Sequence, residues 1–260
     1  MIALQMYTLR EFMKTPAALA ETLRRVRAMG YECVQITPPA FTDASELAAL
    51  LRSCGLRADS AICPLAQIPE RIDQIARDAT ALETDVLRTD SIAVEDRCSA
   101  AGYRRAAEHL NRCGRLAKEK GLRFMYHFHA FEFVQLGDTR GIDILLQETD
   151  PQTVLFQPDV YWLAAAGTEP SQSLKRFSGR AAYMHLKDYV IVPSRTETLE
   201  VARAGSAPVG TGNLNWPGIF AAAREAGISH FVVEDDMGAL DPFESAQMSL
   251  RALREGKLAL

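Results

Sequence analysis

The sequence predicts a closed barrel of eight parallel β-strands, each followed by an α-helix. Short apolar segments alternate with longer amphipathic segments eight times, and units of this kind form parallel sheets with right-handed crossovers. The length of 260 residues is typical of one such barrel, which needs about 250. Hydrophobic residues make up 48% of the chain, enough for a large core. We therefore expect a single (β/α)8 barrel domain over residues 1–260.

Each predicted strand is a short apolar segment that stands before a longer amphipathic one. In chain order the predicted strands are Ile2–Leu9, Tyr31–Ile36, Arg57–Ile62, Val86–Thr89, Arg123–His129, Thr153–Asp159, Ala181–Lys187 and Phe231–Glu234.

The longer segments are the predicted helices, and the first two carry end signals. Thr15 is the expected N-cap before Pro16, while Gly30 and Gly55 stand where a C-terminal glycine is expected. The predicted helices are Pro16–Met29, Asp43–Ser53, Pro69–Leu82, Ala100–Lys120, Ile142–Glu148, Pro170–Phe177, Pro217–Ala226 and Pro242–Glu255.

A doubly wound open sheet is the structural alternative, because it has the same alternation of strands and helices. No GxGxxG motif follows the first predicted strand, which weakens a dinucleotide-binding interpretation. The stretch Tyr189–Asn213 is rich in Gly, Ser, Thr and Pro and has no predicted element. Loops of this length are usually functional or disordered, so we expect limited proteolysis to cut there first.

The net charge and the cysteine content limit the classes of partner and the cellular compartment that we expect. The formal net charge is −4 with both signs interspersed, so no basic face for nucleic acid is expected. The five cysteines form no CxxC pair, and scattered free thiols fit the reducing cytoplasm. The sequence begins without the basic lead of a signal peptide, and no apolar run is long enough to span a membrane.

In a barrel of this kind the active site lies at the C-terminal ends of the strands. Near the ends of the first four strands the polar residues are Gln5, Tyr7, Gln35 and Asp59. The last four strands end in more residues that can bind a metal or carry a proton. His127 and His129 are two residues apart, so they point to the same face of the fifth strand.

The sixth to eighth strands each end in a charged or titratable residue. Asp159 follows an apolar run, and a buried carboxylate is costly unless it is paired or binds a metal; a helix N-cap is the structural alternative. His185 and Lys187 share a face, although a lysine there can also extend to solvent. Glu234 closes the eighth strand, where a surface carboxylate is the alternative. Together with the histidines, these residues suit Mn²⁺, Co²⁺ or Zn²⁺, and Mg²⁺ less well.

Motifs along the whole chain resemble those of the sugar phosphate isomerase/epimerase superfamily, which has the xylose isomerase-like barrel. Leu4–Arg10 resembles its "QxYSxR" start, and Tyr126–Phe133 resembles the "YHNHDFEF" motif of one subgroup. Asp159–Trp162 resembles "LDVxW", His185–Asp188 resembles "HxKD", and Val233–Asp236 resembles the final "VEqD".

The resemblance implies a divalent metal held by Glu, Asp, His and Glu on strands five to eight. Asp159, His185 and Glu234 match the last three of these ligands. His127 stands where the first glutamate is expected, and Glu132 lies nearby in the sequence. We therefore expect the strand-five ligand to be His127.

The leading hypothesis is a metal-dependent isomerase or epimerase that removes a proton next to the carbonyl group of a sugar or keto-sugar. Glu234 and either Glu132 or His127 would move the proton, and Lys187 would polarise a substrate oxygen. The expected substrate-binding residues are Gln5, Tyr7, His129 and Trp162.

Two alternatives remain open at this point, and a third class is disfavoured. A dehydratase or lyase acting on a keto-inositol or a 3-keto-glycoside would begin with the same proton abstraction. A non-catalytic sugar-binding or assembly protein is the second. Apurinic endonucleases share the barrel, but the acidic balance and the five histidines argue against that class. We expect a small, non-phosphorylated sugar as partner, no nucleic acid or membrane partner, and an even-numbered homo-oligomer.

Overall fold

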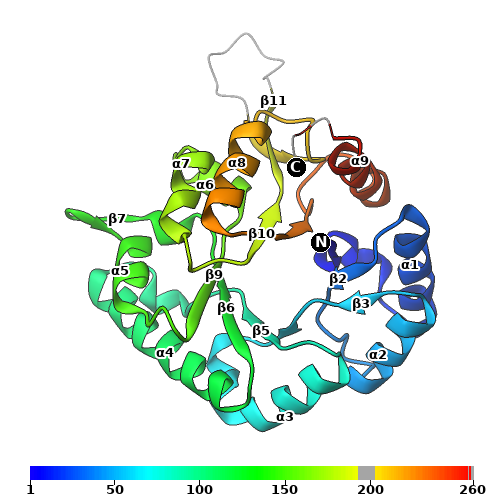
Figure 1. The fold of residues 1–260 in the computed structure, drawn as a ribbon, viewed down its shortest axis with the longest axis horizontal. Helices are drawn as coiled ribbons and strands as arrows, with labels where there is room; N and C mark the ends of the chain where they lie inside the picture. The colour runs from blue at the N-terminus through cyan, green and yellow to red at the C-terminus, as the bar shows by residue number, and fades with distance from the viewer. Residues whose placement is uncertain (193–202, 257, 259–260) are drawn as a thin grey trace.

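Nine parallel strand segments form a closed ring, and helices surround it (Figure 1). The computed structural model describes residues 1–192, 203–256 and 258. The ring consists of β1 (Ile2–Gln5), β2 (Cys33–Gln35), β3 (Arg57–Ala58), β4 (Ala61–Ile62), β5 (Val86–Thr89), β6 (Arg123–His127), β9 (Val154–Gln157), β10 (Tyr183–Leu186) and β13 (His230–Val233).

The ring closes at two points where regular strand pairing is short. β3 and β4 are the two halves of the third barrel strand, interrupted at Asp59 and Ser60. Between β9 and β10 the contact is a parallel bridge that joins Asp159 to His185, and the His185 N–H donates to the carbonyl of Pro158 at 2.8 Å. The eight-stranded barrel prediction is confirmed, and the open-sheet alternative is wrong.

The helices form where the end signals place them. The side chain of Thr15 accepts a hydrogen bond from the Ala18 N–H, and Gly30 ends the first helix with φ 109°. The helices are α1 (Pro16–Met29), α2 (Ala44–Ser53), α3 (Ile68–Ala81), α4 (Ala100–Glu119), α5 (Gly141–Glu148), α6 (Val160–Ala165), α7 (Pro170–Leu174), α8 (Trp216–Ala226) and α9 (Pro242–Arg254). The sequence did not predict α6, which begins directly after Asp159.

The first predicted strand ends earlier than expected. β1 stops at Gln5, whose side chain accepts a hydrogen bond from the Tyr7 N–H, and a 3₁₀ helix follows over Met6–Phe12. This local side-chain bond competes with the continuation of the strand. As a result, Tyr7 lies above the end of the barrel strand and is 54% exposed.

The stretch Tyr189–Asn213 was expected to have no element, and this is wrong for its two ends. β11 (Asp188–Val192) and β12 (Arg203–Ala207) form an antiparallel pair, and residues 193–202 lie outside the described part of the chain. Between β12 and α8, the chain is held by hydrogen bonds to the buried Asp188 carboxylate. This carboxylate accepts hydrogen bonds from the N–H groups of Tyr189, Gly210, Gly212 and Leu214 and from the Trp216 indole. A second short hairpin joins β7 (Gln135–Leu136) to β8 (Thr139–Arg140).

The inside of the barrel is divided into an apolar layer and a polar layer. The apolar layer contains Ala3, Cys33, Val86, Met125, Tyr183 and Val232. Inward-facing residues recur every second position along a strand. Two residues further along the same strands stand Gln5, Gln35, Arg88, His127, His185 and Glu234, all of them buried. The polar layer lies toward the C-terminal ends of the strands, and it positions the candidate site.

Outside the ring, apolar side chains of the strands pack against the surrounding helices. Among the described residues, no helix combines the length and the apolar character needed to cross a membrane.

Candidate metal centre and catalytic pocket

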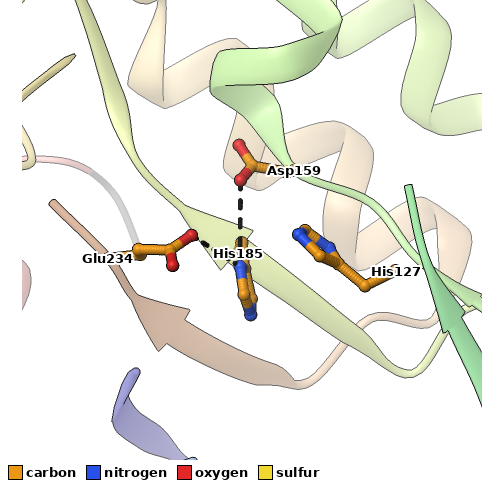
Figure 2. Close-up of side chains that lie close together, drawn as sticks. All are labelled: His127, Asp159, His185 and Glu234. Atoms are coloured by element: carbon orange, nitrogen blue, oxygen red, sulfur yellow. Dashed lines mark hydrogen bonds and ion pairs between the residues drawn. The ribbon is translucent and has the colours of Figure 1, made fainter. Parts of the chain in front are cut away.

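Four residues from four neighbouring barrel strands converge at the C-terminal end of the barrel (Figure 2). His127 ends β6, Asp159 follows β9, His185 lies in β10, and Glu234 follows β13. One ligand atom from each lies within 4.8 Å of the others, and all four side chains are buried. The Nδ1 atom of His185 is 3.1 Å from Glu234 Oε2 and 3.8 Å from Asp159 Oδ2. The structure thus brings together the four residues that the sequence suggested as ligands.

The chemistry of Asp159 fits a bound cation. Its Oδ1 atom caps α6 by accepting hydrogen bonds from the N–H groups of Tyr161 and Trp162. Its Oδ2 atom is buried and has no hydrogen-bond partner among the described residues. A buried carboxylate oxygen without a partner is costly, and a divalent cation between Asp159 and Glu234 would remove that cost. The helix-cap alternative and the ligand interpretation are therefore compatible.

Both histidines of the cluster can act as neutral ligands. Burial, together with the neighbouring His185, lowers the pKa of His127 well below its ordinary value, so this ring is neutral at pH 7. Burial also lowers the pKa of His185, but hydrogen bonds to Asp159 and Glu234 outweigh it and raise this pKa in the metal-free protein. A cation bound between these carboxylates would displace the extra proton of His185.

A pocket of about 310 Å³ opens above the cluster. Besides His127 and Glu234, its walls include the predicted substrate-binding residues Gln5, Tyr7, His129 and Trp162, as well as Lys187. β6 ends at His127, earlier than predicted, so His129 lies two residues beyond the strand. The rings of His127 and His129 are nevertheless 4.8 Å apart, and both line the pocket.

Lys187 is a buried cation in the wall of this pocket. Its side chain is 1% exposed, so the alternative in which it extends to solvent is wrong. The ammonium group forms an ion pair with Asp236 and lies 4.9 Å from the Tyr161 ring centroid and 5.0 Å from that of Trp162. Burial lowers the Lys187 pKa, but nearby carboxylates, foremost Glu234, outweigh this and raise it. Lys187 is therefore a charged donor at neutral pH.

Glu132 is the one predicted site residue that lies neither in the four-residue cluster nor in the pocket wall. Its carboxyl group is fully buried and accepts hydrogen bonds from the Tyr126 hydroxyl and from the His129 N–H, the latter at 2.9 Å. Burial raises the pKa of Glu132 to about 8. Because Tyr126 precedes the inward-facing His127 in β6, its side chain faces outward, and Glu132 lies on that side.

Sequence reasoning missed three charged residues of the pocket. Arg88 is 2% exposed and forms an ion pair with Asp90, and its Nη1 donates to the Gln35 side chain at 2.7 Å. Asp236 forms the ion pair with Lys187. An arginine at an inward position of the apolar fourth strand was the available signal, because a charged side chain there requires partners.

The family model described as xylose isomerase-like TIM barrel matches residues 23–256. An inosose dehydratase of Geobacillus thermodenitrificans is 33% identical over 156 residues, which is 56% of this chain and 52% of that protein. The chain thus spans about half the length of the curated relatives that it matches.

Solved structures similar to the chain show the same fold. A sugar phosphate isomerase/epimerase from Parabacteroides distasonis has a TM-score of 0.78 and 19% identity, over 98% of this chain and 97% of that chain. A structure of IolI protein with a bound zinc atom has a TM-score of 0.71 and 15% identity, over 99% and 98% of the two chains. The barrel, its strand-end cluster and the family match agree: the chain belongs to the xylose isomerase-like TIM barrel family.

Proposed function

We propose that this protein is a metal-dependent lyase that removes water from a polyhydroxylated keto compound after abstracting a proton next to the carbonyl group. One observation carries the proposal: two histidines and two carboxylates converge within 4.8 Å of one another under a pocket of about 310 Å³. Small-molecule sites usually measure about 300–1,000 Å³, so this pocket suits a compound the size of a monosaccharide or a cyclitol.

The four converging residues would hold one divalent cation. Zinc, cobalt or manganese suits a mixture of imidazole and carboxylate ligands, whereas magnesium prefers oxygen ligands. When bound, the cation supplies a Lewis acid that stabilises negative charge developing on a substrate oxygen. The zinc atom bound in the IolI protein, which has the same fold, supports this choice.

We assign His129 as the proton acceptor. Its ring lines the pocket, and its Nδ1 atom is buried with no hydrogen-bond partner among the described residues. Burial lowers its pKa below the ordinary value, so the ring is neutral at pH 7 and can accept a proton. Lys187 donates a hydrogen bond to a substrate oxygen, as the sequence suggested. Glu234 is the second group in the wall that can carry a proton.

Loss of water is favoured over epimerisation because of the residues at and after β6. Epimerisation removes a proton from one face of a carbon and returns one to the other face, so it needs two opposed proton carriers. Epimerases of the superfamily that the sequence resembles use two glutamates for that task. Here His127 replaces one of them and Glu132 lies outside the pocket, so Glu234 would have to work with His129 instead. Elimination needs one base and one donor for the departing hydroxyl group. The inosose dehydratases, similar over about half their length, support the same outcome.

Isomerisation or epimerisation of a keto-sugar is the second candidate. It begins with the same proton abstraction, and one observation favours it. His129 on the β6 side and Glu234 after β13 both line the pocket, so two groups able to carry a proton face it from different strands.

The test is to incubate the protein, loaded with zinc, cobalt or manganese, with inosose and with free ketohexoses in D₂O. Loss of one water molecule by mass spectrometry supports the lyase. Deuterium incorporation without loss of water supports the isomerase or epimerase. Neither product with any of the metals would contradict proton abstraction.

A matched pair of histidine variants tests the assigned base. His129→Asn should lower the rate by about 10²- to 10⁴-fold while the protein keeps its metal. His109→Asn is the control, because burial lowers the pKa of His109 as well, but this residue lies on α4 and does not line the pocket. Equal rates for the two variants would remove His129 from the mechanism.

A further inference from the structure

The Gln35 side chain, at the end of β2, contacts four polar groups beneath the four candidate metal ligands. It is fully buried. Its Oε1 atom accepts hydrogen bonds from Gln5 Nε2 at 3.1 Å and from Arg88 Nη1 at 2.7 Å, and lies 2.7 Å from His185 Nε2. Its Nε2 atom donates to Asp59 Oδ2 at 3.1 Å. The contacts come from β1, β5 and β10 and, through Asp59, from the interruption between β3 and β4, so Gln35 is held from several sides.

These partners determine which end of the amide faces His185. A guanidinium group only donates hydrogen bonds, so the atom of Gln35 that meets Arg88 is the oxygen. Burial raises the pKa of Asp59 to about 6, so its carboxylate is ionised at pH 7 and only accepts hydrogen bonds; the atom of Gln35 that meets it is therefore the nitrogen. His185 therefore faces an acceptor, and its Nε2 atom must carry a proton. In the neutral ring, the lone pair then resides on Nδ1, the atom that faces Asp159 and Glu234.

The other histidine of the cluster, His127, has the opposite tautomer. His127 Nδ1 lies 3.2 Å from the backbone carbonyl of Gln157, which can only accept a hydrogen bond. His127 Nδ1 therefore carries the proton, and its Nε2 atom keeps the lone pair.

We propose that Gln35 is a positioning residue that fixes the tautomer and the ring orientation of His185, so that His185 binds the metal through Nδ1 while His127 binds it through Nε2. The inference rests on the metal site of the proposed function. Partners of this kind, which hold the second ring nitrogen of a histidine ligand, typically account for about 10- to 100-fold in metal affinity. Without the oxygen of Gln35, the His185 Nε2–H group would be buried without an acceptor.

The direct test is NMR of the protein loaded with ¹¹³Cd and labelled with ¹⁵N-histidine. The chain has five histidines, so the spectrum is simple. Scalar coupling to ¹¹³Cd should appear for two imidazoles, one through Nδ1 and one through Nε2. Coupling of both rings through Nε2 would overturn the inference. A protein that takes up no cadmium, zinc, cobalt or manganese would instead contradict the proposed function.

Variants of Gln35 test its role through zinc affinity, measured by competition with a chelator. Gln35→Met removes the acceptor and should weaken zinc binding by about 10- to 100-fold. Gln35→Glu keeps an acceptor for His185 and should restore most of the affinity. Ser60→Ala is the matched control, because Ser60 is buried and donates to Asp59 at 2.8 Å without contacting His185; its zinc affinity should equal that of the wild type.

Wild-type affinity in Gln35→Met, or equal losses in Gln35→Met and Gln35→Glu, would overturn the role of Gln35. If Gln35→Met does not fold, as circular dichroism would show, the ¹¹³Cd coupling pattern of the wild type and of Gln35→Glu decides.

Discussion

Glu132→Gln separates a structural role of this carboxyl group from a catalytic one. Glu132 is fully buried, and burial raises its pKa from 4.5 to about 8. The folded protein therefore holds the protonated acid at neutral pH, and glutamine has nearly the same shape as that form. The glutamine oxygen can accept from the His129 N–H, and its NH₂ group can donate to the Tyr126 hydroxyl oxygen. We expect the variant to fold and to keep its turnover.

The pKa of Glu132 also sets the size and sign of the effect on stability. Because the folded pKa lies above the ordinary value, the contribution of this group is fully present below pH 4.5 and is lost as the pH rises through about 8. One pKa unit corresponds to about 1.4 kcal/mol, so the loss over this range approaches about 5 kcal/mol. Glutamine does not titrate. Relative to the wild type, the variant should therefore gain about 1.4 kcal/mol per pH unit between about pH 5 and 7.5.

Urea unfolding at several pH values, with metal content and turnover measured in parallel, tests both statements. Glu108→Gln, at an exposed position in the middle of α4, is the control, and its stability difference from the wild type should not change by about 1.4 kcal/mol per pH unit. A stability difference between Glu132→Gln and the wild type that does not change with pH would refute the argument from burial. Loss of turnover with full metal content would return Glu132 to the catalytic residues.

Two further substitutions address the cluster and the pocket wall. Asp159→Asn keeps a side-chain oxygen that can cap α6 but should bind much less metal, as measured by elemental analysis. Asp159→Ala should also lose the cap, which lowers the free energy of unfolding by about 1 kcal/mol. Full metal occupancy in Asp159→Asn would exclude it as a ligand. Lys187→Met should lower kcat by about 10²- to 10³-fold, since a charged donor to a developing negative charge is lost, with metal content unchanged. Wild-type kcat in this variant would show that Lys187 only forms the ion pair with Asp236 and does not act on the substrate.

The barrel and the residues at its mouth could be predicted because both follow from simple periods. Eight strand–helix units predicted the ring, and the spacing of two between His127 and His129, or between His185 and Lys187, predicted that each pair enters the mouth. These predictions need only the alternation of side chains along a strand and the approximate place of its end. The local sequence indicates both, although β1 and β6 end earlier than predicted.

What the sequence did not reveal depends on specific side-chain contacts, some local and some between residues far apart in the chain. Glu132 looked close to the site because it is five residues from His127, but its hydrogen bond to Tyr126 holds it on the outer side of β6. Asp188 was noted only as the last residue of a strand motif, yet its carboxylate binds the segment between β12 and α8 through hydrogen bonds. Gln35 was only one of several polar residues near the strand ends, and its role emerges from the contacts with Arg88 and His185.

The replacement of a carboxylate by His127 changes the charge of the site. Asp159 and Glu234 together carry two negative charges, and with His127 and His185 neutral, a bound divalent cation makes the four-ligand site formally neutral. A third carboxylate in place of His127 would leave it negative by one. The neutral site should hold its metal less tightly, because one charge–charge attraction is missing, and should stabilise negative charge on a substrate oxygen more effectively.

The remaining charges of the pocket also cancel, which bears on the class of substrate. Lys187 is neutralised by Asp236, and Arg88 by Asp90, so neither cation offers an unpaired charge to a ligand. A phosphorylated or acidic substrate would bring at least one negative charge into a largely buried site and would have to separate one of these pairs. A neutral polyol ketone can instead exchange hydrogen bonds with the same groups while both pairs stay intact. The charge pattern therefore favours an unphosphorylated keto compound over a sugar phosphate as the substrate.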